Sequence, residues 1–235
     1  MSLTLYVGNK NYSSWSMRPW VLLRQAGIAF DERMVRFDSF SDDSRFKHAV
    51  RDVNPAGKVP VLVDDAVPGA AGPLAIWDTL AICEYVAERF PEHQLWPADV
   101  AARARARSVC AEMHAGFGAL RTHFIMNIEA SLPEIGQIVL RDRPEVAADV
   151  ARIVAMWSEL LARHGGPMLF GEFSIADAYF APVCMRFNTY GVPVPDEIGD
   201  YIDRVFALPG VAAWVEDARA EADFLPFEEP YRLSR

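Results

Sequence analysis

Cysteine is scarce in this chain of 235 residues, and the three cysteines that occur do not form a recognisable pair. Cys83, Cys110 and Cys184 lie far apart in apolar helical patterns, and the sequence contains no C-x-x-C. This spacing excludes the common zinc-ligand patterns and the dithiol redox motif. Free thiols in apolar surroundings are typical of a reducing compartment. We therefore expect no metal site and a cytoplasmic protein.

Positive charge is also in short supply. The sequence has 23 Lys and Arg against 32 Asp and Glu, which gives a formal net charge of −9. A general nucleic-acid binder usually carries a basic face, so no nucleic-acid partner is expected. The local exception, residues 103–107, indicates a solvated helix face, with an anion contact as the alternative. No stretch approaches the apolar length of a membrane span, and the N-terminus lacks a signal pattern, so no membrane partner is expected.

Apolar residues make up 51% of the sequence, which is sufficient for a packed core. The first 90 residues alternate between strand and helix patterns. We predict strands at residues 2–7, 30–37, 59–63 and 74–76, helices at about 16–26 and 79–90, and a short helix or loop at 42–50. The order is therefore β-α-β, then a hairpin, then α.

From Pro97 onward the pattern is helical. Apolar residues step at helical spacing from Ala101 through Phe124, and a polar break is expected over residues 131–143. Further helices are expected at about 146–161, after the S-x-x-D capping signature that begins at Ser174, and at 198–207 and 211–222. Pro182 should kink the helix that contains it. The predicted organisation is a domain at 1–90, an all-helical domain at 98–225 and a C-terminal tail at 226–235.

A serine-rich turn at residues 11–20 joins the first strand to the first helix. The first turn of a helix has unpaired N–H groups and a partial positive charge. Ser13 or Ser14 can cap this helix. With the same geometry, a hydroxyl can donate a hydrogen bond to an anion held at the helix start.

Several motifs together resemble the cytosolic glutathione transferases. Residues 13–18, Ser-Ser-Trp-Ser-Met-Arg, are similar to the S-S-C-S-x-R of zeta-class enzymes. Residues 57–62 look like the segment that holds the family's cis-proline, and residues 78–82 resemble its E/Q-S-x-A-I motif. Residues 174–177 match the S-x-A-D capping box of the helical domain. The resemblance implies a thioredoxin-like N-terminal α/β domain of order βαβ-ββα and an all-α C-terminal helical bundle.

The same resemblance implies a glutathione S-transferase that uses a serine to activate the glutathione thiol. Ser14 lies four residues before Arg18, as in theta-type members, and Ser13 matches the first serine of the zeta motif. We favour Ser14 slightly, with Tyr6 and Tyr12 as rivals. Trp15 stands where zeta enzymes have a cysteine, which disfavours zeta-type isomerase chemistry and glutaredoxin-like activity.

Glutathione is the only co-substrate expected. The residues expected to bind it are Lys58, at its glycyl carboxylate, Val59 and Pro60, through a cis bond that turns the Val59 backbone outward, and Asp78 and Thr79, at its γ-glutamyl end. Each has a simpler structural alternative: a solvated lysine, a trans proline at a strand edge, and ordinary helix capping.

A small hydrophobic electrophile is expected between the two domains, a usual place for ligand pockets. The walls expected for it are Trp15, Met113, Phe117 and Arg121, although core packing is an alternative for each. By resemblance alone, a homodimer is expected. The other functions that this sequence leaves open are a glutathione-dependent isomerase, a peroxidase and a non-catalytic thioredoxin-fold binding module.

Overall fold

The computed structural model describes residues 3–69 and 71–235. Its N-terminal part contains β1 (Leu3–Val7), α1 (Ser14–Gln25), β2 (Asp31–Met34), α2 (Arg45–Arg51), β3 (Val61–Asp64), β4 (Leu74–Ile76) and α3 (Thr79–Arg89). The predicted order βαβ-ββα is confirmed, and the short helix that was one of the two alternatives for residues 42–50 is α2, which runs from Arg45 to Arg51. Ser2, which we expected in the first strand, lies outside the described residues.

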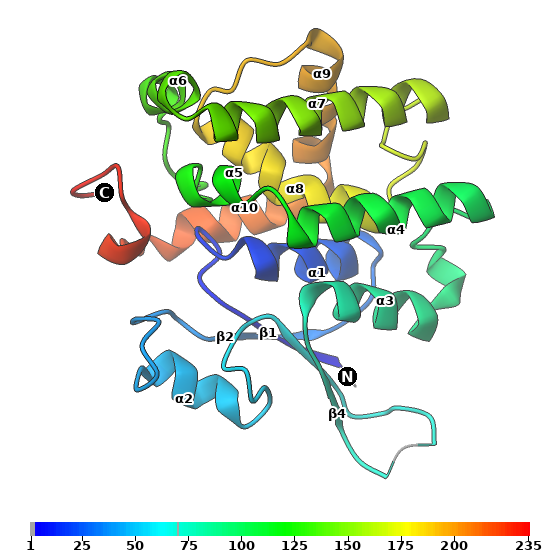
Figure 1. Cartoon of the computed structure of the whole chain (residues 1–235). Coiled ribbons are helices and arrows are strands. Elements are labelled where there is room, and N and C mark those ends of the chain that lie inside the picture. The colour runs from blue at the N-terminus through cyan, green and yellow to red at the C-terminus, as the bar shows by residue number, and fades with distance from the viewer. Residues whose placement is uncertain (1–2, 70) are drawn as a thin grey trace.

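The four strands form one sheet in the order β2-β1-β3-β4. β1 pairs with β2 in parallel and with β3 in antiparallel orientation, so that Leu5 lies opposite Glu32 on one side and Leu62 on the other. Alternation along β1 directs Leu3 and Leu5 into the large core, whereas Tyr6 packs on a smaller cluster beneath α2. The sheet thus lies between α2 and the pair α1 and α3 (Figure 1).

The C-terminal part is all helical. It contains α4 (Val100–Ala115), α5 (Gly118–His123), α6 (Pro133–Asp142), α7 (Pro144–His164), α8 (Ile175–Thr189), α9 (Asp196–Ala207) and α10 (Pro209–Glu221), and short 3₁₀ turns occupy Pro91–His93 and Pro226–Glu228. α8 and α10 pack directly on α1, so this helix lies between the sheet and the helical bundle (Figure 1). The start of α1 is consequently the point where the two parts meet.

α8 begins at the capping box that the sequence predicts. The Ser174 hydroxyl accepts a hydrogen bond from the Ala176 N–H at 3.2 Å, and the Asp177 carboxylate accepts one from the Ser174 N–H at 2.9 Å. The helix continues through Pro182 to Thr189, and almost all of it is buried. It is therefore the central helix of this part of the molecule.

Two details of the helical prediction are wrong. The apolar stripe through Phe124 is not one helix, because Gly116 leaves the helix and Phe117 adopts a left-handed φ of 54° between α4 and α5. Residues 131–143 are not a break, because α6 occupies most of them and begins at Pro133. α6 can pack here because Gly136 has no side chain: a Cβ would lie 1.8 Å from the Tyr190 carbonyl oxygen.

No helix within residues 3–69 and 71–235 combines the length and the apolar character needed to cross a membrane.

Candidate active site at the start of α1

The Ser13 hydroxyl is used in hydrogen bonds within the turn. It is the N-cap of α1, and its hydroxyl accepts a hydrogen bond from the Ser16 N–H at 3.4 Å. The same hydroxyl donates its proton to the Ser16 Oγ at 2.8 Å, and that oxygen also accepts the Gly8 N–H at 3.1 Å. With its proton directed at Ser16, the Ser13 hydroxyl is not available to donate to a ligand.

Ser14, the first residue of α1, has a different environment. Its Oγ accepts a hydrogen bond from Nη2 of Arg186 at 3.1 Å, although the two residues are 172 positions apart in the sequence. Within the described part of the chain, the Ser14 hydroxyl donates to no other group. A buried hydroxyl with an unused donor stands at the positive end of α1, which is where an anion is stabilised.

Tyr12 is tied to the C-terminal segment. Its hydroxyl donates to Oε1 of Glu229 at 2.6 Å, and the same carboxylate accepts two hydrogen bonds from Nδ2 of Asn127 at 2.9 Å. Burial and the neighbouring Glu229 raise the pKa of Tyr12 to about 12. A hydroxyl that is held in this way is a poor donor to a second anion. Tyr6, the other tyrosine considered, does not line the cavity described next.

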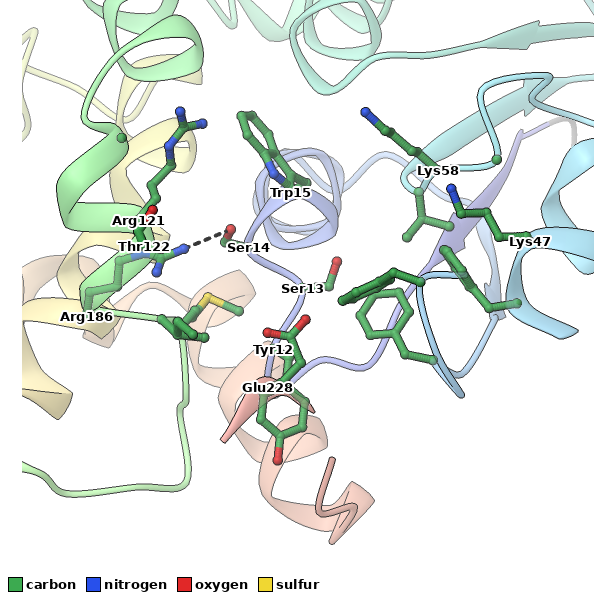
Figure 2. A pocket seen from close by; sticks show the side chains of 18 residues that line it. Tyr12, Ser13, Ser14, Trp15, Lys47, Lys58, Arg121, Thr122, Arg186 and Glu228 are labelled. Carbon is green, nitrogen blue, oxygen red and sulfur yellow. Dashed lines mark hydrogen bonds between the residues drawn. The ribbon is translucent and has the colours of Figure 1, made fainter. Parts of the chain in front are cut away.

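A cavity of about 700 Å³ opens over this turn, and Tyr12, Ser13, Ser14 and Trp15 all line it (Figure 2). We call its side from the α/β domain the N-terminal wall; it consists of Lys47, Gly57, Lys58 and Val59. We call the opposite side the C-terminal wall; it consists of Gly118, Arg121, Thr122, Ile125, Met126, Arg186 and Glu228. Phe37, Phe40 and Phe46 complete the lining.

The bond between Val59 and Pro60 is cis, as the sequence predicts. Val59 and Lys58 line the cavity, and Pro60 is buried directly behind them. Lys58 is exposed, and Lys47 from α2 lies beside it on the same wall. Two of the three lysines in the sequence therefore face this cavity.

Asp78 and Thr79 lie next to Trp15 but do not line the cavity. Thr79 is fully buried, and its hydroxyl donates to the Trp15 carbonyl at 3.2 Å, which joins the start of α3 to α1. Asp78 is the exposed N-cap residue of α3; its side chain makes no capping hydrogen bond, and its Oδ1 lies 3.9 Å from Nδ1 of His114.

Of the four residues expected in an electrophile pocket, the structure brings Trp15 and Arg121 to the cavity. The Trp15 ring has the Arg18 guanidinium 4.4 Å and the Arg121 guanidinium 5.5 Å from its centre, distances typical of cation–π contacts. Met113 and Phe117 are not there: both are buried in the main core, Met113 on α4, which packs against α8, and Phe117 in the turn between α4 and α5.

Three charged residues of the cavity were not anticipated from the sequence: Lys47, Arg186 and Glu228. Arg186 is 5% exposed, and burial lowers its pKa to about 9. Burial raises the pKa of Glu228 to about 7, while the positive charge of Arg186 opposes that shift. Within residues 3–69 and 71–235, neither residue forms an ion pair with a group of opposite charge at contact distance. A capping or spacing signal does not mark such residues, because only the tertiary fold brings them to the cavity.

The charges in the cavity favour an anionic ligand. Lys47, Lys58, Arg121 and Arg186 supply four cations, and Glu228 is the one acid among the lining residues. The helix start adds a further partial positive charge next to Ser14. A ligand with carboxylates and a nucleophilic atom that can ionise matches this arrangement.

Comparison with known proteins agrees with the fold. Residues 12–89 match the family described as "Glutathione S-transferase, N-terminal domain", and residues 100–217 match "Glutathione S-transferase, C-terminal domain". The chain is 28% identical over 183 residues to a zeta-class glutathione S-transferase of Euphorbia esula, covering 75% of this chain and 74% of that one. It is 25% identical over 190 residues to a stringent starvation protein A homolog of Histophilus somni, covering 79% and 78%.

Among solved structures, the chain resembles a glutathione transferase homolog from Burkholderia that was crystallised with bound glutathione. The TM-score is 0.66 at 25% identity, over 93% of this chain and 98% of that one. The fold and the site therefore define a two-domain protein, with a thioredoxin-like domain joined to a helical bundle and a ligand cavity at their junction. The chain belongs to the glutathione S-transferase family.

Proposed function

We propose that this chain is a glutathione S-transferase in which the Ser14 hydroxyl stabilises the glutathione thiolate for attack on a small hydrophobic electrophile. The observation that carries the proposal is the buried Ser14 hydroxyl, whose donor is unused and which lines a cationic cavity at the start of α1. Ser13 is a weaker candidate because its proton is already donated to Ser16.

The reaction needs a thiolate because a thiol is a poor nucleophile. A cysteine-like thiol has a pKa of about 8.5, so most of it is protonated at neutral pH. A hydrogen bond to the sulfur anion, together with the positive end of a helix, favours the ionised form. In the proposed mechanism the thiol proton leaves to solvent, Ser14 donates to the sulfur, and the sulfur forms a bond to carbon as the leaving group departs.

The residues on the two walls fit the other parts of glutathione and its partner. We propose that Lys58, with Lys47 beside it, binds the glycyl carboxylate, and that the Val59 backbone pairs with the cysteinyl segment next to Pro60. The γ-glutamyl end is proposed to lie toward Trp15 and the neighbouring start of α3, where Asp78 and Thr79 are found. The phenylalanines and Met126 offer apolar contacts for the electrophile.

The proposal is tested by retention on immobilised glutathione and by turnover of a chloronitroaromatic substrate. We expect both for the unchanged protein. Ser14→Ala should lower kcat/KM about 100-fold, the usual effect of removing one preorganised donor to a developing anion. Ser13→Ala is the matched control: it removes a hydroxyl one position away and should lower kcat/KM by less than about tenfold. A protein that neither binds glutathione nor turns over the substrate contradicts the proposal.

A second candidate function is a non-catalytic binding module of the same fold. It is favoured by the similarity to a stringent starvation protein A homolog, which is not named as a transferase. The turnover assay separates the two candidates, because a binding module should retain glutathione or a protein partner without forming the conjugate.

A further inference from the structure

The contact between Arg186 and Ser14 fixes the direction of the serine proton. A guanidinium has hydrogen-bond donors and no acceptor, so Ser14 Oγ must accept from Arg186 Nη2 at 3.1 Å. The hydroxyl hydrogen must then point away from Arg186. The other end of the guanidinium is held by the Phe124 carbonyl, which accepts from Nη1. Arg186 thus bridges the residue after α5 and the first residue of α1, and Figure 2 shows its contact with Ser14.

Stability does not explain a cation at this position. Arg186 is almost completely buried in α8. Within the described residues it has no carboxylate partner at ion-pair distance, and a buried charge without a partner is costly. The charged and titratable groups that face it are Arg18 on α1, Arg121 on α5, Glu228 on the C-terminal turn and Tyr190 after α8. Two of these four are further cations, which increases the cost of keeping Arg186 charged.

We propose that Arg186 is the positioning residue for Ser14: by donating to its oxygen, Arg186 turns the hydroxyl proton into the cavity, toward the sulfur. The inference rests on the proposed role of Ser14 in activating the thiol. It adds that activation depends on a residue of the helical domain, which lies on the opposite wall of the cavity. Arg186 acts through Ser14 and does not itself form the bond to the sulfur.

The contact can be tested without glutathione by replacing the serine oxygen with sulfur. In Ser14→Cys, the introduced thiol should accept from Arg186 and ionise at least about one pKa unit below the thiol of the matched variant Ser13→Cys, which has no such contact. That difference is about tenfold in thiolate fraction at neutral pH, and the pH dependence of alkylation by iodoacetamide measures it. The background is low because Cys83, Cys110 and Cys184 are buried and burial raises the pKa of each thiol.

The difference between these variants should vanish when Arg186→Met is added and shrink without vanishing when Arg186→Lys is added, because lysine keeps the positive charge but loses the planar guanidinium that reaches both Ser14 and Phe124. Equal titration of the two introduced thiols, or a difference that survives Arg186→Met, overturns the proposal. If Arg186→Met fails to fold, as judged by circular dichroism, the comparison between Ser14→Cys and Ser13→Cys still decides, because it leaves Arg186 in place.

A second measurement asks whether Arg186 acts through Ser14. The ultraviolet absorbance of bound glutathione thiolate is followed against pH in the unchanged protein, Arg186→Lys, Ser14→Ala and Ser14→Ala with Arg186→Lys. When Ser14 is present, we expect Arg186→Lys to raise the pH at which the thiolate forms. In the Ser14→Ala background, the same substitution should change the thiolate fraction by less than about twofold. An equal shift in both backgrounds overturns the positioning role. If the unchanged protein shows no glutathione thiolate, the proposed function fails, while the cysteine titration still reports on the contact itself.

Discussion

The two walls of the cavity carry similar charge in opposite environments. On the N-terminal wall, Lys58 is exposed and Lys47 half-buried, and water can hydrate both side chains when no ligand is bound. On the C-terminal wall, Arg186 is buried against Ser14, and the pKa values of Arg186 and Glu228 are both shifted toward the neutral forms by burial. Substitutions on the N-terminal wall should therefore change the free energy of unfolding little, whereas substitutions on the C-terminal wall are coupled to stability.

The coupling comes from how each wall is held. The N-terminal wall comes from two stretches close together in the sequence, α2 with Lys47 and the segment that precedes the cis bond between Val59 and Pro60. The C-terminal wall is assembled from α5, α8 and the turn at Pro226–Glu228, and the next residue, Glu229, anchors that turn. The adjacent acids differ sharply: hydrogen bonds from Arg232, Tyr12 and Asn127 lower the pKa of Glu229, whereas burial raises that of Glu228. Glu229 thus anchors the turn, whereas Glu228 lines the cavity.

The largest expected effect comes from removing the anchor of the C-terminal wall. Glu229→Ala removes the buried carboxylate that accepts from the Tyr12 hydroxyl and the Asn127 amide, and it leaves Arg232 with Glu129 as its remaining acidic partner. Breaking one side of a buried polar network costs about 3 kcal/mol, and we expect that decrease in the free energy of unfolding by urea denaturation. Glu159→Ala, which breaks an exposed pair with Arg163, is the control and should change it by less than about 0.5 kcal/mol. If both variants lowered the free energy of unfolding equally, Glu229 would not account for the link between the C-terminal wall and stability.

Glu228→Gln should stabilise the protein at alkaline pH. The pKa of Glu228 is raised from its ordinary 4.5 to about 7, so between these values the folded protein keeps a proton that the unfolded chain has released. The free energy of unfolding therefore falls as pH rises through this window. Because the open cavity still hydrates part of the carboxyl, we expect the Gln variant to be more stable by about 1–2 kcal/mol at pH 8. Below pH 4.5 the difference should disappear. A constant difference across the range would contradict the burial of this charge.

Ser13→Ala should cost about 1 kcal/mol of stability, since it removes the N-cap hydroxyl of α1. Thermal unfolding measures the loss. Ser14→Ala is the matched variant, and it removes no capping hydrogen bond. Any change in stability that it causes therefore measures the loss of the hydroxyl oxygen that accepts from Arg186. If Ser13→Ala lowers mainly stability and Ser14→Ala lowers mainly activity, Ser13 has the structural role and Ser14 the chemical one.

The smallest effect is expected on the N-terminal wall. Lys58→Met should raise the KM for glutathione about threefold at low salt, and added salt should shrink the difference because an exposed cation is screened. The free energy of unfolding should stay within about 0.5 kcal/mol of the unchanged protein. Arg45→Met removes the same charge from an exposed side chain outside the cavity and should leave KM unaltered. A large loss of stability in Lys58→Met would remove the contrast between the walls.

The sequence was informative where one short segment contains the whole feature. The turn that presents Ser13 and Ser14, the cis bond before Pro60 and the capping box at Ser174 are each local, and the structure contains them. Arg186 and Glu228 could not be found in this way. Arg186 is 172 residues from Ser14, in a helix whose other residues are almost all buried, and no spacing rule relates them.

The errors in the fold have local causes. The stripe through Phe117 keeps helical spacing, and the break was marked only by the flanking Gly116 and Gly118, which favour leaving a helix. α6 was missed because its residues are partly polar, although Pro133 at its first turn is a recognised start signal. Met113 and Phe117 have the composition of a pocket wall, but composition does not distinguish a wall from the core.

The bond between Tyr12 and Glu229 also sets an order in time. A chain emerging from the ribosome presents the serine turn almost first, whereas Arg186 follows Ser14 by 172 positions and Glu229 follows Tyr12 by 217. Contacts between such distant segments form late, because a long loop must be closed before they can contribute. The nascent N-terminal domain therefore has the hydroxyls but not Arg186 or Glu228. The cavity is therefore assembled only after residue 228 has been synthesised, and until then the turn that we propose to activate the thiol lacks its C-terminal wall.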